Sequence, residues 1–219
     1  MLDPALLLLV LWGVLAGIDL VSFPQGLLGR PIVAASVAGF LAGDLEVGLQ
    51  LGLLLELYAL DVLPIGSARY PDYGPAAVVA AGSAVLTGAD ALGPAALLGL
   101  ITAQVAGQAM EWMRRFNGRR VRAAEAALAA GDVGVLHRLQ RWGLAGDMLR
   151  SAVVVLAGLA IAPALLRLMA PASTALTLVL VAGGAAAAAH GLLQRAGVGA
   201  NRRWAAASLG TGLVIAWLL

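Results

Sequence analysis

Long apolar runs, separated by short polar or glycine- and proline-bearing segments, follow one another along most of this chain. A helix needs about twenty apolar residues to span a bilayer. On that scale the pattern predicts spanning helices over residues 4–22, 75–89, 93–113, 148–169, 173–194 and 204–219. The chain is therefore predicted to be an all-α polytopic membrane protein, with residues 1–219 forming a single membrane-embedded domain.

Two apolar runs, 31–43 and 45–60, are each short for a span. Gly43 and Asp44 separate them, and the polar, proline-bearing segment 61–74 follows. Glycine and proline at these positions are strong breaker signals. The pattern favours broken half-helices or a re-entrant hairpin in the N-terminal half.

Residues 114–146 differ in character from the rest, because seven arginines lie between Arg114 and Arg141. We expect amphipathic helices at about 117–130 and 132–142, with Gly131 between them. Loops rich in arginine face the cytoplasm in membrane proteins. The segment is therefore predicted to be cytoplasmic.

The composition agrees with this class, since 61% of residues are hydrophobic and only 12% are charged. Soluble domains carry about a quarter charged residues. The chain has no cysteine, which excludes disulfides, thiolate metal sites and a cysteine nucleophile. We expect no metal, no cofactor and no nucleic-acid partner, and we read the two histidines, His137 and His190, as structural.

Charged residues recur among glycines from Arg30 to Asp72, inside an otherwise apolar stretch. Ionisable side chains at bilayer depth are costly, so they mark polar paths or pair with one another. Asp44, Gly48, Gly52 and Glu56 recur every four residues, which places them on one face of a helix. The two glycines would let another backbone approach, with Glu56 at the end of that contact.

The same stretch resembles the IIC subunit of mannose-type sugar phosphotransferase systems. The ordered, gap-free pattern that carries the resemblance is Arg30-Pro31, Gly43-Asp44, Gly48, Gly52, Glu56, Ile65-Gly66 and Pro71-Asp72. Gly143–Arg150 and Ala182-Gly183-Gly184 resemble family positions more loosely. The chain departs from the family pattern at Leu53-Leu54, at Pro64 and at Tyr73-Gly74-Pro75, and it is shorter than typical members at its C-terminal end.

The resemblance implies a sugar-binding element, and carboxylates are strong acceptors for sugar hydroxyls. The candidate substrate-binding residues are Glu56, Asp72, Ser67, Tyr58 and Tyr73. The candidate structural or gating residues are Arg30, Asp44, Gly43, Gly48, Gly52 and Gly66. Other roles stay open: Glu56 could pair with an arginine for structure, Asp72 could cap a helix, and the tyrosines could anchor the membrane interface. Arg30 could pair with Asp44, with Asp19 or with a helix end.

The resemblance further implies a non-catalytic permease subunit of the inner membrane. It would carry a sugar across the bilayer together with a IID membrane subunit, and soluble IIB and IIA phosphocarrier subunits would couple transport to phosphorylation. The arginine-rich segment could provide a docking surface for such a soluble subunit, and the complex is expected to be oligomeric. Two alternatives remain: an uncoupled or ion-coupled transporter, and a membrane scaffold or receptor without transport activity.

Overall fold

The computed structural model describes residues 3–60, 62, 69–88 and 91–195, and every regular element within them is helical. In chain order the elements are α1 Pro4–Asp19, α2 Pro31–Ala42, α3 Leu45–Ala59, α4 Tyr73–Thr87, α5 Leu92–Ala123, α6 Glu125–Ala129, α7 Val133–Met169, the 3₁₀ turn η1 Ala170–Ala172 and α8 Ser173–Arg195. The predicted all-α class is confirmed. The predicted span over 204–219 lies outside the described residues.

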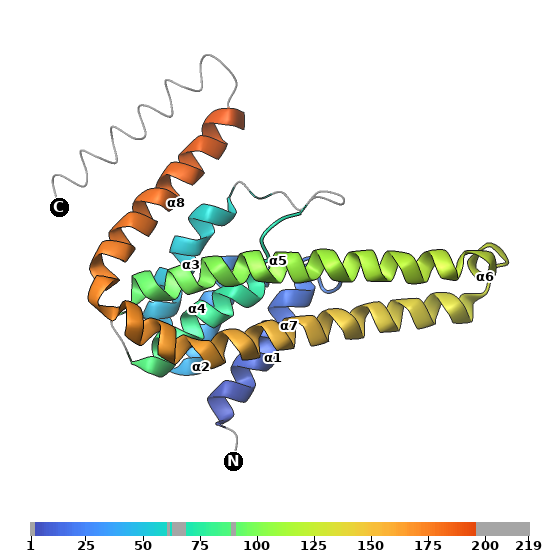
Figure 1. The fold of residues 1–219 in the computed structure, drawn as a ribbon, viewed down its shortest axis with the longest axis horizontal. Helices are drawn as coiled ribbons and strands as arrows, with labels where there is room; N and C mark the ends of the chain where they lie inside the picture. The colour runs from blue at the N-terminus through green and yellow to red at the C-terminus, as the bar shows by residue number, and fades with distance from the viewer. Residues whose placement is uncertain (1–2, 61, 63–68, 89–90, 196–219) are drawn as a thin grey trace.

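The two longest helices, α5 and α7, run antiparallel and side by side, and their joined ends project beyond the rest of the molecule (Figure 1). The short α6 forms the tip of this projection. Helices α1, α3 and α4 pack against the other half of the pair, and α2 packs against these three helices. After η1 the chain turns back, and α8 contacts α5 and α3.

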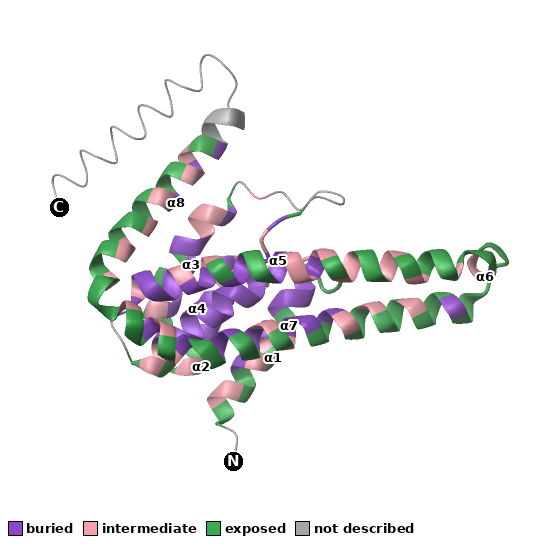
Figure 2. Cartoon of the chain, in the orientation of Figure 1, coloured by how far each residue is buried: buried purple, intermediate pink, exposed green. Residues whose placement is uncertain are grey.

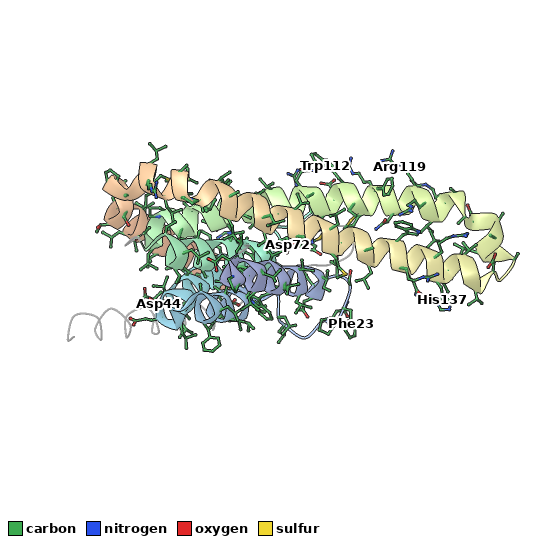
Figure 3. The ribbon with its side chains drawn as sticks, turned by 90° about the horizontal axis from the view of Figure 1, so that it is seen from below. Phe23, Asp44, Asp72, Trp112, Arg119 and His137 are labelled. Carbon is green, nitrogen blue, oxygen red and sulfur yellow. The ribbon has the colours of Figure 1, made fainter. Side chains whose placement is uncertain are left out.

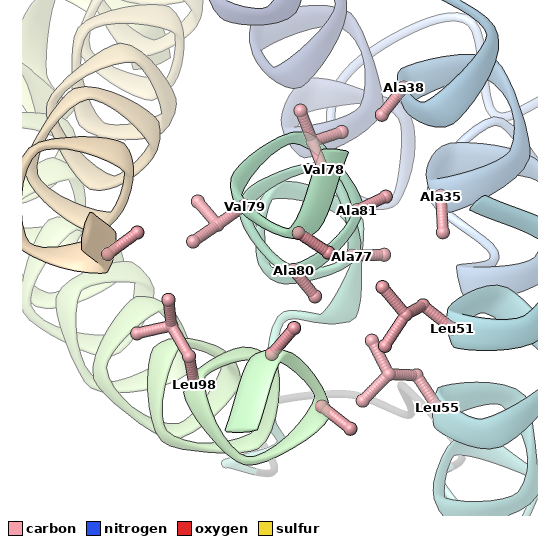
Figure 4. Close-up of a cluster of buried hydrophobic side chains, with 14 of the residues drawn as sticks. Ala35, Ala38, Leu51, Leu55, Ala77, Val78, Val79, Ala80, Ala81 and Leu98 are labelled. Carbon is pink, nitrogen blue, oxygen red and sulfur yellow. The ribbon is translucent and has the colours of Figure 1, made fainter. Parts of the chain in front are cut away.

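Helix α4 lies at the centre of the bundle, and all its residues from Tyr73 to Ala84 are buried. A helix that is apolar on every side is typical of a buried position. Its small side chains let neighbouring helices approach closely, which is the usual basis of helix packing in membranes. Figure 4 shows Val78, Val79 and the surrounding alanines of α4 between the side chains of α2, α3 and α5.

The short runs predicted at 31–43 and 45–60 are two separate helices, α2 and α3. Helix α2 ends at Gly43, whose φ of 106° is a left-handed conformation that favours glycine. Asp44 then caps α3, because its carboxylate accepts a hydrogen bond from the backbone N–H of Val47 at 3.1 Å. The chain therefore reverses within two residues, and α2 and α3 pack against each other as a hairpin.

The backbones of α2 and α3 touch at the glycine positions of α3. A side chain added at Gly48 would lie 2.6 Å from the carbonyl oxygen of Ala35, and one at Gly52 would lie 3.0 Å from Cα of Ile32. Close approach of another backbone is what the four-residue glycine spacing predicts.

The expected helices at 117–130 and 132–142 are wrong in their boundaries. Helix α5 continues without a break from the apolar residues to Ala123, and α7 continues from Val133 to Met169. The change in composition at Arg114 thus marks no helix end, because alanine and arginine are both strong helix formers. Gly131, with a φ of 80°, does lie at the turn before α7.

The outer faces of the helices carry many exposed large apolar side chains, including Leu11, Val153 and Leu178 (Figure 2). Within the described residues, α5 and the run Val133–Gly191 are long and apolar enough to cross a membrane. Pro4–Asp19, Pro31–Ala42 and Tyr73–Thr87 are apolar but shorter.

Candidate functional site

A cavity of about 310 Å³ opens where the C-terminal ends of α1 and α3 meet the N-terminal ends of α2 and α4. Its volume is at the lower end of the range for small-molecule sites. Its walls are mainly apolar. Among the described residues, four polar side chains line it: Asp19, Gln25, Arg30 and Tyr73.

Asp19 shapes the wall of the cavity that follows α1. Its two carboxylate oxygens accept hydrogen bonds from the backbone N–H groups of Gly26, at 2.7 Å, and Gly29, at 3.0 Å. The residue is only 3% exposed. A buried carboxylate is stabilised when hydrogen bonds replace water at its oxygens. Asp19 therefore fixes the loop that leads to Arg30.

Arg30 and Glu56 form an ion pair at the edge of the cavity. The second oxygen of Glu56 accepts a hydrogen bond from the backbone N–H of Ile32 at 3.1 Å. A side chain of the last turn of α3 thus provides an acceptor for a backbone N–H in the first turn of α2, which has no partner within its own helix. The Arg30 side chain is 36% exposed and lines the cavity, while Glu56 is 15% exposed and lies behind it. Arg30 thus pairs with Glu56 rather than with Asp44 or Asp19.

A second polar network lies inside the bundle and centres on Arg150 of α7. Its guanidinium contacts Asp72, at 2.7 Å, and Asp147, at 2.9 Å, and all three residues are buried. Figure 3 shows Asp72 in the interior, beside the long helices. Asp72 precedes α4 but its carboxylate makes no capping hydrogen bond. Its side chain serves the ion pair with Arg150.

The Arg150 network joins four helices. The guanidinium also donates to the backbone carbonyls of Gly17, at 3.3 Å, and Ala106, at 3.4 Å. Asp147 accepts a hydrogen bond from the Ser22 hydroxyl at 2.8 Å. One carboxylate oxygen of Asp72, Oδ1, is buried without a hydrogen-bond partner among the described residues. Two carboxylates therefore share one arginine, with one oxygen left unsatisfied.

The predicted tyrosines lie in different places. Tyr73 lines the cavity. Tyr58 instead donates its hydroxyl to the carbonyl of Leu180 in α8 at 2.8 Å. Its ring packs on Gly183 and Gly184, the step that resembles the family more loosely. Ser67 and Gly66 lie outside the described residues.

Sequence reasoning missed three charged residues of these networks as site residues: Asp19, Asp147 and Arg150. Each carried a signal, because each is a charge inside or at the end of an apolar run. The spacing of Asp147 and Arg150 also places both on one helix face. Their partners could not be read from the sequence, since Arg150 and Asp72 are 78 positions apart.

The model of the family of PTS system sorbose-specific IIC components matches residues 5–193. A sorbose-specific EIIC component of Klebsiella pneumoniae is 42% identical over 52 residues, which cover 24% of this chain and 20% of that protein. A fructose permease IIC component of Bacillus subtilis is 38% identical over 74 residues, which cover 34% of this chain and 27% of that protein. These alignments thus span less than a third of either relative.

Two solved structures share the fold over the whole chain. One is a membrane protein with a TM-score of 0.67 and 20% identity, and the other belongs to the complex of the mannose transporter ManYZ with microcin E492, with a TM-score of 0.65 and 18% identity. Each likeness covers 100% of this chain and 96% of the other. Together with the family match, they make this chain a multi-pass protein of the inner membrane. It belongs to the family of sorbose-specific IIC components of the sugar phosphotransferase system.

Proposed function

We propose that this chain binds a sugar and carries it across the inner membrane as the IIC subunit of a phosphotransferase complex. The observation that supports this most is the cavity at the meeting of four helix ends, with Asp19, Arg30 and Tyr73 in its wall. Convergent polar groups in a mostly apolar pocket are typical of small-ligand sites. The relatives in this family are sorbose and fructose components, which favours a sugar of that kind.

Arg30 and Tyr73 in the cavity wall, and Glu56 behind Arg30, each have a chemical use in sugar binding. Arg30 supplies N–H donors, Glu56 holds Arg30 in position and offers an acceptor, and the ring of Tyr73 can cover an apolar sugar face. Asp72, Tyr58 and Ser67 stay predictions as direct contacts. For Asp72 and Tyr58 such a contact would require a change of partner, from Arg150 and Leu180 respectively.

The hairpin of α2 and α3 suits a broken-helix mechanism. At 1.5 Å per residue the two helices are about 18 Å and about 22 Å long, less than the hydrocarbon core of about 30 Å. We infer that the hairpin enters the membrane without crossing it. The turn at Gly43, together with the break that the sequence predicts at Gly66, would let it move the sugar site between the two faces, as broken helices do in other transporters.

The proposed partners are a IID membrane subunit and the soluble IIB and IIA phosphocarriers, in an oligomeric complex. The tip of the α5–α7 pair, with its arginines, would lie in the cytoplasm and offer an acidic soluble subunit a docking surface. Phosphorylation of the sugar there would trap the product inside the cell. The chain itself, over residues 1–219, would form one transport domain without a covalent catalyst.

Uptake into membrane vesicles tests this function. We expect sorbose or fructose uptake to require phosphoenolpyruvate and the soluble phosphocarriers, and to continue when the proton gradient is collapsed. Uptake that does not depend on phosphoenolpyruvate, and that stops when the proton gradient is collapsed, would contradict the proposed coupling to sugar phosphorylation.

One observation favours a second candidate, an ion- or proton-coupled transporter. Asp72 and Asp147 share a single arginine, and Oδ1 of Asp72 has no hydrogen-bond partner among the described residues. Such a carboxylate could take up a cation or a proton, as intramembrane acids do in transporters. Gradient-driven uptake that is lost in Asp72→Asn would select this candidate.

A further inference from the structure

A second and larger groove, of about 620 Å³, runs between α5 and α7 on the outside of the bundle. One end is lined mainly by apolar side chains, among them Met113, Leu149 and Val153, together with the buried, ion-paired Arg150. The other end is lined by Phe116, Arg120 and Trp142. The groove therefore changes from apolar to aromatic and basic along its length.

Arg120 stands at the basic end, between the two helices. Its guanidinium carbon lies 5.2 Å from the ring centre of Phe116 and 5.4 Å from that of Trp142. These cation–π contacts join α5 to α7 and position the charge. Among the described residues, no carboxylate lies within ion-pair distance of Arg120 and no hydrogen bond satisfies its donors. An anion that reaches this end of the groove would find a positioned, unsatisfied arginine.

The groove crosses the level of α5 and α7 at which the sequence predicts the membrane boundary. Its apolar end belongs to the predicted spans, whereas its other end belongs to the arginine-rich segment. Exposed aromatic residues mark the same level, since Trp112 is 64%, Phe116 52% and Trp142 57% exposed. Tryptophan gathers where the bilayer meets water. Trp112 and Arg119 both point away from the bundle on α5 (Figure 3).

We propose that this groove is a binding site for an anionic phospholipid, with an acyl chain along Met113, Leu149 and Val153 and the phosphate on Arg120. Arginine binds phosphate oxygens through paired N–H donors. Basic pockets between helices on the cytoplasmic side are known sites for anionic headgroups. The seven arginines of the segment, against Glu125 and Asp132, make its charge complementary to such a lipid rather than to a zwitterionic one.

An apolar helix from a partner or from a second copy of this chain fits the groove less well. It would fill the apolar end but leave Arg120 without an anion and place apolar surface against a basic rim. An amphiphile with one anionic end and one apolar end matches both halves of the groove.

Native mass spectrometry of the purified full chain tests the proposal, with phosphatidylglycerol and phosphatidylcholine offered in equal amounts. We expect the protein to retain phosphatidylglycerol in preference, and Arg120→Gln to reduce that preference about fivefold, since one arginine near an anionic lipid contributes about that factor. Arg122→Gln is the matched control, because Arg122 is exposed on the same helix but does not line the groove. It should leave the preference unchanged.

A second variant, Ala145→Phe, tests the place of the acyl chain. Ala145 is exposed and lines the groove, so a larger side chain there can fill the groove without disturbing the core. Retention of the lipid should fall, while the thermal unfolding midpoint in detergent stays the same. Equal retention of the two lipids by the unaltered chain, or an equal effect of Arg120→Gln and Arg122→Gln, would overturn the proposal.

Cross-linking from the groove can show whether a lipid or a protein occupies it in the native membrane. The chain has no cysteine, so Ala145→Cys introduces a unique thiol for a photoreactive cross-linker. Cross-links to phospholipid are expected. Cross-links mainly to another protein or to a second copy of the chain would overturn the proposal.

Discussion

Arg150 of α7 donates to Asp72, the residue before α4, across 2.7 Å, and the two side chains are only 6% and 1% exposed. The same guanidinium also holds Asp147 and the backbone of α1 and α5. Three buried charges therefore fix the position of the central helix against its neighbours. The cavity with Arg30 and Tyr73 adjoins the start of this helix, so the network supports the candidate site without lining it.

Removing Arg150 is expected to destabilise the fold strongly. In Arg150→Leu two buried carboxylates lose their counter-charge, which typically costs about 3–5 kcal/mol. Arg141→Leu makes the same chemical change at an exposed position of the same helix and should have little effect. Thermal unfolding in detergent and abundance in the membrane measure both. Equal stability of the two variants would contradict the role given to Arg150.

Glu56→Gln is expected to reduce sugar uptake while the protein remains folded. The ion pair with Arg30 is partly exposed, and such pairs contribute at most about 1 kcal/mol to stability. A charge-assisted hydrogen bond in the site is worth more, so we expect uptake to fall about tenfold or more. Glu46→Gln on the same helix is the control, because within the described part of the chain the Glu46 carboxylate accepts a hydrogen bond only from Gln50. A parallel fall of abundance and uptake in Glu56→Gln would instead indicate a structural role.

Gly48→Ala should disrupt the hairpin of α2 and α3. The added methyl group would meet the carbonyl oxygen of Ala35 at 2.6 Å, and backbone atoms cannot move aside as a side chain can. Overpacking of this kind costs about 1–3 kcal/mol. At Gly118 on α5 an added methyl group would make only an ordinary van der Waals contact, with the Arg122 side chain at 3.7 Å, so Gly118→Ala should be neutral or stabilising. A lower unfolding midpoint for Gly118→Ala than for Gly48→Ala would contradict the close backbone contact between α2 and α3.

Tyr58→Phe distinguishes two roles of this tyrosine: a hydrogen bond that holds α8, and the direct sugar contact that the sequence predicts. Losing the hydrogen bond to Leu180 should cost about 1 kcal/mol of stability and leave sugar affinity unchanged. Equilibrium sugar binding, measured alongside thermal unfolding, decides between them. A loss of affinity at unchanged stability would show that Tyr58 contacts the sugar, as the sequence predicts.

The sequence predicted the local features of this fold well. The reversal at Gly43-Asp44 and the glycine face of α3 follow from breaker residues and four-residue spacing, which are local properties of the chain. The extent of α5 and α7 was missed, because hydropathy reports where the bilayer ends and not where a helix ends. The pairing of Arg150 with Asp72 and of Arg30 with Glu56 depends on helix packing, and nothing local to either residue specifies its partner.

Protection of a single cysteine by sugar tests the central claim, that the cavity of about 310 Å³ holds the substrate. Leu27 lines the cavity and is 69% exposed, so Leu27→Cys gives a reactive thiol in a chain without other cysteines. Leu136→Cys, exposed on the α7 end of the arginine-rich segment, is the control. We expect sorbose or fructose, at ten times its Kd, to slow maleimide labelling of Leu27→Cys about tenfold and to leave Leu136→Cys unaffected. Labelling of Leu27→Cys that proceeds at the same rate with saturating sugar would contradict the account.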